Sequence, residues 1–403
     1  MIVVTGLGAV SAAGVGRGPL AEAVARGEPR TVAIDLSQGI HGEGAARTAA
    51  LIDQREVARL IPPLAARRMS APSRYAIVAA RTALQDAGVE IGGFPDPDFA
   101  VVASTALGPS SFTQRLVDQI LDEGPAMASP ALFSECVANA PAAQVALACR
   151  ARGPNLTIAQ SEAGPLRAVA RGAAEVLGGR ARLALAGSVD EMIPLVHAIL
   201  DRFRSLARPA PGRPERARPF DRGRDGFLAA EGATFLVLET EESALGRDAR
   251  PLARLRGGWS AFDPSAPASG WGRGAEALAR ALGRGLERCG LTPPEVDLIV
   301  SGASGSIAGD RLEADVLRRV WDGPSLPPVV APKATTGEYG AFLGAALLAA
   351  AGAPVGPTAG FEEIDPELRI VPHAGGGLGD VRHVLVTTLA AGGAASWLVL
   401  ERP

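Results

Sequence analysis

The sequence predicts an α/β protein of two similar halves, with helices layered between sheets. Three observations predict this class. Fully apolar strands alternate with amphipathic helices through the first half, as in a sheet covered on both faces. The apolar run 296–301 repeats the type of the run 99–105, each followed by a turn of small residues, which indicates a weak internal duplication. Because 403 residues exceed what one hydrophobic core usually serves, we expect halves over residues 1–240 and 241–403.

The individual elements are predicted from the spacing of apolar residues. Short apolar runs predict strands, and apolar residues at helical spacing predict helices. Strands are expected at 2–10, 99–105, 156–159, 182–188, 234–239, 296–301, 329–332 and 395–401, and helices at 74–88, 110–123, 142–150 and 165–177. The Pro/Arg-rich segment 205–218 is predicted to be an exposed loop. Gly6 and Gly8 lack the third glycine of a dinucleotide-binding turn, so we interpret them as an ordinary tight turn.

A strand, a sharp turn and a helix meet at residues 160–165. The apolar run Leu156–Ala159 predicts the strand, and Pro165 suits the first turn of the helix, where its missing N–H is no loss. Such an elbow holds one side chain at the N-terminus of a helix, a common position for a nucleophile. The residue at the tip is Glu162, which is no nucleophile for acyl transfer.

Composition excludes several classes of function. A net charge of −3 provides no basic field for nucleic acid. The longest uncharged apolar run, Ala341–Val355, is too short to span a bilayer comfortably, so we interpret it as a buried helix. The N-terminus reads directly as a strand, without the pattern of a secretory signal. We therefore expect a cytoplasmic protein that binds neither nucleic acid nor a membrane.

Residues that bind metals or form disulfides are sparse. Cys136, Cys149 and Cys289 are widely spaced and lack a CxxC pattern, which favours free thiols. The four histidines have no metal-ligand spacing, so we expect no metal and no cofactor. Lys333 is the only lysine in a chain that otherwise uses arginine. Either its position needs a compact ammonium group, or one lysine has survived by chance.

Six segments carry a family resemblance when they are taken in order. They are VVTGLGAVSAAGVG at 3–16, RGPNLTI at 152–158, RPFDRGRDGF with AEGA at 218–233, GDRLEAD at 309–315, APKATTG at 331–337 and LAAGGAASWLVLE at 389–401. At this spacing, and over nearly the whole chain, they resemble the β-ketoacyl synthase branch of the thiolase-like fold. The resemblance implies two duplicated halves in an αβαβα layered architecture.

The resemblance also identifies three substituted positions. Active members of this family use a Cys-His-His set, in which the elbow cysteine takes the acyl chain and the histidines assist decarboxylation. The matching positions here carry Glu162, Gly302 and Glu338, whereas the lysine of the last motif is kept as Lys333. This pattern looks like the chain-length factor (KSβ) subunit of type II polyketide synthases, in which Gln is the more usual elbow residue. The resemblance implies a non-catalytic chain that forms a heterodimer with an active ketosynthase, works with an acyl carrier protein and shapes the elongation tunnel.

The substituted site brings together two acidic residues, Glu162 and Glu338. Two carboxylates about 4 Å apart repel by on the order of 4 kcal/mol at an effective dielectric constant of ~20. Either Glu162 or Glu338 is protonated, or Lys333 lies between them as a counter-ion. We hypothesise the second arrangement, a closed charge network of Glu162, Lys333 and Glu338 that fills an inactive site.

Two further hypotheses concern the length of the tunnel and a different catalytic activity. The resemblance places the tunnel-capping positions at Ser110, Thr113 and Val117, where small residues would leave a longer tunnel unless these side chains are ordinary helix packing. An alternative function is a malonyl-carrier-protein decarboxylase or thioester hydrolase that uses Glu162 and Glu338. A nucleophilic Ser161 with Glu162 and His197 is disfavoured because the elbow lacks GxSxG.

Overall fold

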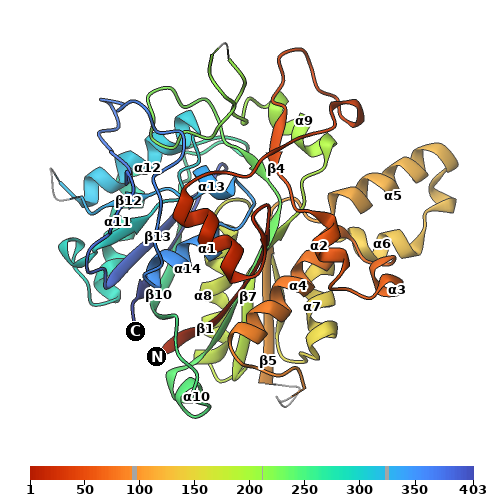
Figure 1. Ribbon diagram of the computed structural model, residues 1–403, viewed down its shortest axis with the longest axis horizontal. Helices are drawn as coiled ribbons and strands as arrows, with labels where there is room; N and C mark the ends of the chain where they lie inside the picture. The colour runs from red at the N-terminus through yellow and green to blue at the C-terminus, as the bar shows by residue number, and fades with distance from the viewer. Residues whose placement is uncertain (93–97, 211, 323–325) are drawn as a thin grey trace.

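One mixed sheet runs through both halves of the chain (Figure 1). The structure is a computed structural model that describes residues 1–92, 98–210, 212–322 and 326–403. Ten strands follow one another in the order β12-β11-β13-β14-β10-β1-β9-β7-β5-β6, and β2 (Gly14–Val15) pairs with β1 at the side. The two halves therefore share a sheet and do not form separate bodies.

The two halves use the same strand order. The first half contributes β1 (Ile2–Ser11), β5 (Phe99–Thr105), β6 (Asn155–Ala159), β7 (Leu183–Asp190) and β9 (Gly232–Thr240), and the second β10 (Ala253–Phe262), β11 (Leu298–Val300), β12 (Val329–Val330), β13 (His383–Leu389) and β14 (Ala394–Glu401). If the five strands of each half are numbered in chain order, both halves have the order 3-2-4-5-1 from the outer edge of the sheet to its middle. The two first strands, β1 and β10, pair antiparallel and join the halves. The predicted duplication is thus confirmed.

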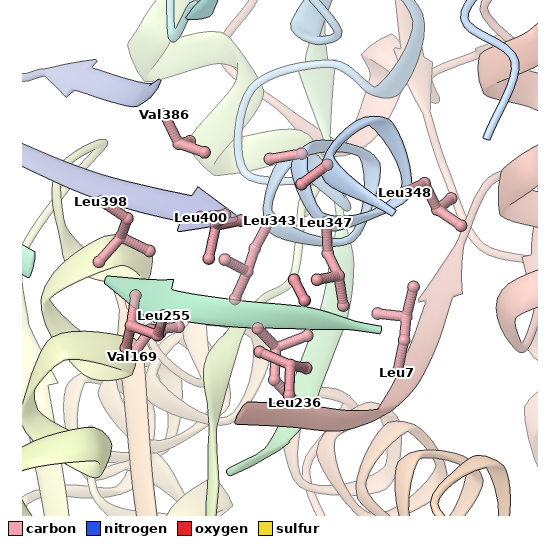
Figure 2. Packing of buried hydrophobic residues seen from close by; sticks show 14 of the residues in the cluster. Leu7, Val169, Leu236, Leu255, Leu343, Leu347, Leu348, Val386, Leu398 and Leu400 are labelled. Carbon is pink, nitrogen blue, oxygen red and sulfur yellow. The ribbon is translucent and has the colours of Figure 1, made fainter. Parts of the chain in front are cut away.

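Helices and strands alternate in five layers. In the middle, α8 (Gly164–Leu177) and α14 (Phe342–Ala350) pack between strands of both halves. Figure 2 shows residues of this one cluster, among them Val169 of α8, Leu343 and Leu347 of α14, and the strand residues Leu255 and Leu400. On one outside, α4 (Ala71–Asp86) and α7 (Ala140–Cys149) cover the first-half strands. On the other, α11 (Ala275–Arg288) and α12 (Ile307–Val320) cover the second-half strands. The predicted αβαβα architecture is confirmed.

Further elements surround this core. They are α1 (Arg17–Arg26), β3 (Val32–Ala33), η1 (Leu36–Gln38), β4 (Thr48–Ala50), α2 (Gln54–Ala58), α3 (Pro63–Ala66), α5 (Ser110–Glu123), η3 (Pro125–Met127), α6 (Pro130–Cys136), α9 (Pro194–Arg202), β8 (Ala229–Ala230), α10 (Glu241–Leu245), η4 (Pro293–Glu295) and α13 (Lys333–Thr336). Strands β3, β4 and β8 form a small second sheet. Helices α5 and α6 project from the body (Figure 1).

Some local predictions need correction. The segment 205–218 is not wholly exposed, because Ala217 and Arg218 at its end are buried, and the Arg218 guanidinium donates to the carbonyl oxygens of Pro214 and Arg216. Strand β10 was not expected, since its arginines and glycines interrupt the apolar pattern of a half-exposed strand. The run that begins at Ala341 is confirmed as a buried helix, because every residue of α14 is buried.

No single helix among the described residues is long and apolar enough to span a membrane. One pair, α6 and α7, which meet at a bend of 91°, would satisfy that criterion together by length and composition.

Candidate functional site

The elbow places Glu162 just before the first residue of α8. Strand β6 ends at Ala159, and the Gln160 N–H donates to the carbonyl of Thr105 on the neighbouring strand. The turn closes where the Gly164 N–H donates to the carbonyl of Ser161 at 2.8 Å. A Cβ on Gly164 would lie 3.1 Å from the Cβ of Ser104, so the helix starts close against β5. Short hydrogen bonds and this close approach fix the tip of the turn.

A buried ion pair faces the elbow. The Lys333 ammonium lies 2.6 Å from Oε1 of Glu338, and the two side chains are 2% and 4% exposed. The same ammonium lies 5.2 Å from the centre of the Phe342 ring, within the range of a cation–π contact. Gly337 has φ of 72°, and a Cβ there would lie 2.5 Å from the Cβ of Ala230. The glycine therefore allows the chain to turn Glu338 back toward Lys333.

Glu162 interacts electrostatically with this pair but makes no direct contact with it. Its Oε2 atom is buried and has no hydrogen-bond partner among the described residues. Burial is the largest cause that raises the pKa of Glu162, to about 7; the charge of Glu338 raises it further, and Lys333 lowers it. Within the described chain, the ion pair of Lys333 is with Glu338. All three predicted residues thus share one site, in which Glu162 stands apart from the direct pair.

The space between these groups is small. Ser104, Glu162, Asp190, Glu338 and Phe342 are among the residues that line a cavity of about 20 Å³. That volume holds about one water molecule and leaves no room for an acyl chain. Burial raises the pKa of Asp190 to about 7, although hydrogen bonds from the backbone of Leu107 and the hydroxyl of Thr105 oppose the shift. Side chains and carboxyl groups therefore fill the interior behind the elbow.

Glu162 also borders a second and larger cavity, which we call the mouth. The mouth has a volume of about 260 Å³ and is lined by Phe203, Arg204, Trp271 and Ser304, among others. Phe203 and Arg204 are exposed at its rim. Glu162 therefore separates a cavity open to large groups from one that admits only water.

The third substituted position, Gly302, has no room for a side chain. It follows β11 and is buried. A Cβ on Gly302 would lie 2.7 Å from the carbonyl oxygen of Thr387 and 2.9 Å from the Cα of Thr388, both on β13. The backbone of a neighbouring strand thus occupies the space that a histidine would need.

The three proposed tunnel residues lie on α5, away from Glu162. None of them lines either cavity that Glu162 borders. The Ser110 hydroxyl donates to the carbonyl of Leu107, and the Thr113 hydroxyl to those of Pro109 and Cys136. Val117 is 46% exposed. The outer face of this projecting helix is therefore partly apolar and uncovered.

His197 is not brought to Ser161. It is fully buried on α9, where Nδ1 lies 2.9 Å from Nε2 of His41 and Nε2 lies 3.3 Å from the carbonyl of Thr48. The three cysteines are free thiols, of which Cys149 is buried. Tyr339 and Phe342 of the cavity lining were missed by sequence reasoning, although their position directly after Glu338 was a signal that could have identified them.

Comparison with known proteins identifies the class and then the family. A duplicated, five-layered α/β fold with a strand–turn–helix elbow defines the thiolase-like class. The model of the β-ketoacyl synthase N-terminal domain matches residues 1–244, and that of the C-terminal domain matches residues 252–353. The chain belongs to the β-ketoacyl synthase family.

Its relatives include subunits of polyketide synthases. The chain is 31% identical over 414 residues to the tetracenomycin polyketide synthase ketoacyl synthase beta subunit of Streptomyces glaucescens, covering 100% of this chain and 98% of the relative. It is 28% identical to the ishigamide ketosynthase/chain length factor, with a TM-score of 0.88 over 100% of this chain and 99% of the other. A type II polyketide synthase acyl-carrier protein in complex with its ketosynthase bound to the hexaketide contains a chain of the same fold, with a TM-score of 0.87 and 22% identity over 100% of this chain and 99% of that one.

The raised pKa of Glu162 predicts a pH-dependent effect of Glu162→Gln. Because the folded-state pKa lies near 7, above the unfolded value of roughly 4.3, the fold favours the protonated acid. The stability that Glu162 contributes is therefore complete below the unfolded pKa and is lost as the pH rises through about 7. Thermal unfolding at pH 5 and pH 8 should show that Glu162→Gln gains stability over the wild type on going to pH 8. The exposed Glu242→Gln is the matched control, and parallel curves for Glu162→Gln and wild type would contradict the prediction.

Proposed function

We propose that this chain is a non-catalytic chain-length factor, which pairs with an active ketosynthase and shapes the tunnel for the growing chain. The observation that carries the proposal is the carboxylate at the tip of the elbow, behind which the Lys333–Glu338 pair and Phe342 leave about 20 Å³. A carboxylate forms no thioester by acyl transfer from a carrier, and the interior has no space for an acyl chain. The chain therefore has a ketosynthase scaffold without an acyl acceptor.

The open edge of the sheet supports a protein partner. Among the described residues, β6 is the last strand of the sheet and pairs only with β5, so its other edge is free. A groove of about 490 Å³ beside this edge is lined by Leu156 and Ile158 of β6, Arg167 and Arg171 of α8, and Trp259 of β10. A free strand edge next to a mixed apolar and basic groove is a surface that proteins usually cover. We assign the partner ketosynthase to this face.

The exposed apolar residues of α5 and α6 extend this argument. Leu121 is 76% exposed and Phe133 is 61% exposed, in addition to Val117. In the proposed heterodimer this projecting region covers the end of the partner's tunnel, with Ser110, Thr113 and Val117 as the capping positions. In this heterodimer the ketosynthase carries the cysteine and catalyses condensation, whereas this chain shapes the tunnel.

Substitutions on α5 test the tunnel proposal. Bulky Ser110→Phe or Val117→Trp should shorten the polyketide made by the heterodimer, because each adds a ring at a capping position. Product length is measured by mass spectrometry after reconstitution with the ketosynthase and the acyl carrier protein. Ser110→Thr, which adds only a methyl group, is the matched control and should leave the product unchanged. An unaltered product with both bulky variants would contradict the assignment.

Co-expression tests the proposed function as a whole. The tagged chain should purify together with a cysteine-containing ketosynthase, and condensing activity should appear only when both are present. Intact-mass analysis after incubation with an acyl thioester should show an adduct on the ketosynthase and none on this chain, and a Cys→Ala ketosynthase should show none on either. An acyl adduct on the isolated chain, or full condensing activity without a companion, would overturn the proposal.

An acyl carrier protein is the second proposed partner. Arg204 is exposed and lines the mouth, and Arg202 is exposed two residues before it, whereas Arg208 is held by Asp201 at 2.8 Å. The first two arginines are therefore the better placed to attract an acidic carrier protein.

One observation favours the alternative of thioester hydrolysis or decarboxylation. Glu162 borders the mouth, and its raised pKa suits a general base near neutral pH. The isolated chain provides the test: release of thiol from an acyl thioester or of CO₂ from a malonyl thioester, abolished by Glu162→Gln, would establish that function. Equal background rates in the wild type and in Glu162→Gln would exclude it.

A further inference from the structure

Two histidines outside the site fasten an exposed turn to α9. His41 lies in the segment 39–44, in which Ile40 and residues 42–44 are exposed. His197 is buried on α9, and its Nδ1 lies 2.9 Å from Nε2 of His41. The other hydrogen bonds of this segment among the described residues are local, such as those of Gly39 to Leu36 and of Ala45 to Gly42. The histidine pair is therefore the polar attachment of the turn to the body of the protein.

The contacts of the two rings define their protonation. The carbonyl of Thr48 can only accept, so His197 carries a proton on Nε2 and donates it across 3.3 Å. Its Nδ1 is then an acceptor, and His41 donates from Nε2. The Nδ1 atom of His41 is buried and has no partner among the described residues. In this arrangement both imidazoles are neutral.

An added proton is incompatible with this arrangement. On Nδ1 of His197 it would set two N–H groups against each other at 2.9 Å. On Nδ1 of His41 it would bury an N–H without an acceptor, which is unfavourable. We propose that His41 and His197 form a proton-sensitive latch, which holds the turn 39–44 on α9 when both rings are neutral and releases it on acidification.

Neighbouring charges define which part of the chain is released. Asp201 on α9 accepts from the Ala46 N–H and pairs with Arg208 of the following loop. Glu215 accepts from the N–H groups of Arg47 and Thr48. On η1, which packs against α9, Asp35 accepts from Ser37 and Gln38. Asp201 and Glu215 keep residues 46–48 attached, so the moving part is the turn 39–44.

The direction of the pH effect agrees with the burial of His197. Burial is the largest cause that lowers the pKa of His197, His41 lowers it further, and the Thr48 carbonyl and Asp201 oppose the shift. The neutral ring is thus favoured in the fold, and its contribution is present above the unfolded pKa of roughly 6.5 and is lost as the pH falls below it. Because α9 continues into Phe203 and Arg204, release of the turn uncovers a helix that ends at the mouth.

Backbone nitrogen-15 relaxation tests the latch. The readout is the backbone nitrogen-15 order parameter, because the amides of residues 40–44 donate no described hydrogen bond that would protect them from exchange. At pH 5.5 the order parameters of residues 39–44 should fall below about 0.6, from about 0.85 for a fastened turn at pH 7.5. Residues 45–50 should change little. A wild-type turn with equal order parameters at both pH values would overturn the proposal.

The variant His41→Gln separates the latch from a general acid effect. A glutamine amide can donate to neutral His197 and can accept from its protonated form, so the turn should stay fastened at both pH values. His383→Gln, at a histidine outside this pair, should leave the wild-type pH response intact. A fall in the order parameters at pH 5.5 that persists in His41→Gln would contradict the latch. Nitrogen-15 spectra of the four histidines add a second readout, since a proton on Nδ1 of His197 at pH 7.5 would also contradict it.

Discussion

Replacing Lys333 with Met should lower the free energy of unfolding by about 3–5 kcal/mol, because one member of a buried ion pair is removed and the other is left charged. The ammonium is almost fully buried, lies 2.6 Å from Glu338 and also stands over the ring of Phe342. Methionine retains most of the volume and the contact with the ring but not the charge. The loss should therefore be electrostatic, and chemical denaturation at pH 7.5 measures it.

The double variant Lys333→Met/Glu338→Gln is the matched control. It removes the carboxylate that the single variant leaves unpaired, so it should recover a large part of the lost stability. Equal destabilisation by the single and the double variants would show that packing, and not charge, accounts for the effect. An unchanged melting temperature in Lys333→Met would show that the ion pair does not contribute to stability.

Gly302→Ala should destabilise the protein by roughly 3 kcal/mol or more, the upper part of the range for overpacked sites. The added Cβ would meet backbone atoms of Thr387 and Thr388 at 2.7–2.9 Å, and a strand in the middle of a sheet cannot move aside easily. Gly283→Ala is the matched control, because nothing lies within 4 Å of its Cβ position on α11. There the same substitution should stabilise by about 0.5–1 kcal/mol through helix propensity.

The comparison of the two glycines also concerns catalysis. If Gly302→Ala is strongly destabilising, then a triple variant with Cys at 162 and His at 302 and 338 should fail to restore condensation, since the histidine needs more space than alanine. Equal stability of the Gly302→Ala and Gly283→Ala variants would show that β13 can shift to make room for a side chain. Condensing activity could then be restored by substitution at the three positions.

Periodicity predicted many of the strands and helices, but it missed the half-exposed strand β10 and also the buried strand β13. The bounds of α5 and β5 agree with the expected 110–123 and 99–105, because both elements have an uninterrupted apolar pattern. Strand β10 was missed because Arg254, Arg256 and two glycines break its pattern, and its place is determined by pairing with β14. The long-range partner of a strand is not encoded in its own residues.

The sequence was sufficient to predict which residues form the site, but not how their side chains are arranged. Motif positions identified Glu162, Lys333 and Glu338 as neighbours, and the structure places all three around one cavity. That Lys333 contacts Glu338, while Oε2 of Glu162 has no described partner, depends on the turn at Gly337 and on the volume of Phe342. Such details follow from packing between segments far apart in the chain.

The strand order has a consequence for synthesis on the ribosome. Strand β1 ends at Ser11, yet both of its long neighbours, β9 and β10, begin only at Gly232 and Ala253. At about 5–20 residues per second, the nascent strand waits roughly 10–50 s for its first long neighbour. Strand β14, which lies last along the described chain, inserts between β13 and β10, so β10 waits longer still for its second long neighbour. Until β9 and β10 are made, the apolar strand β1 lacks its long neighbours, and we expect the nascent chain to need a chaperone.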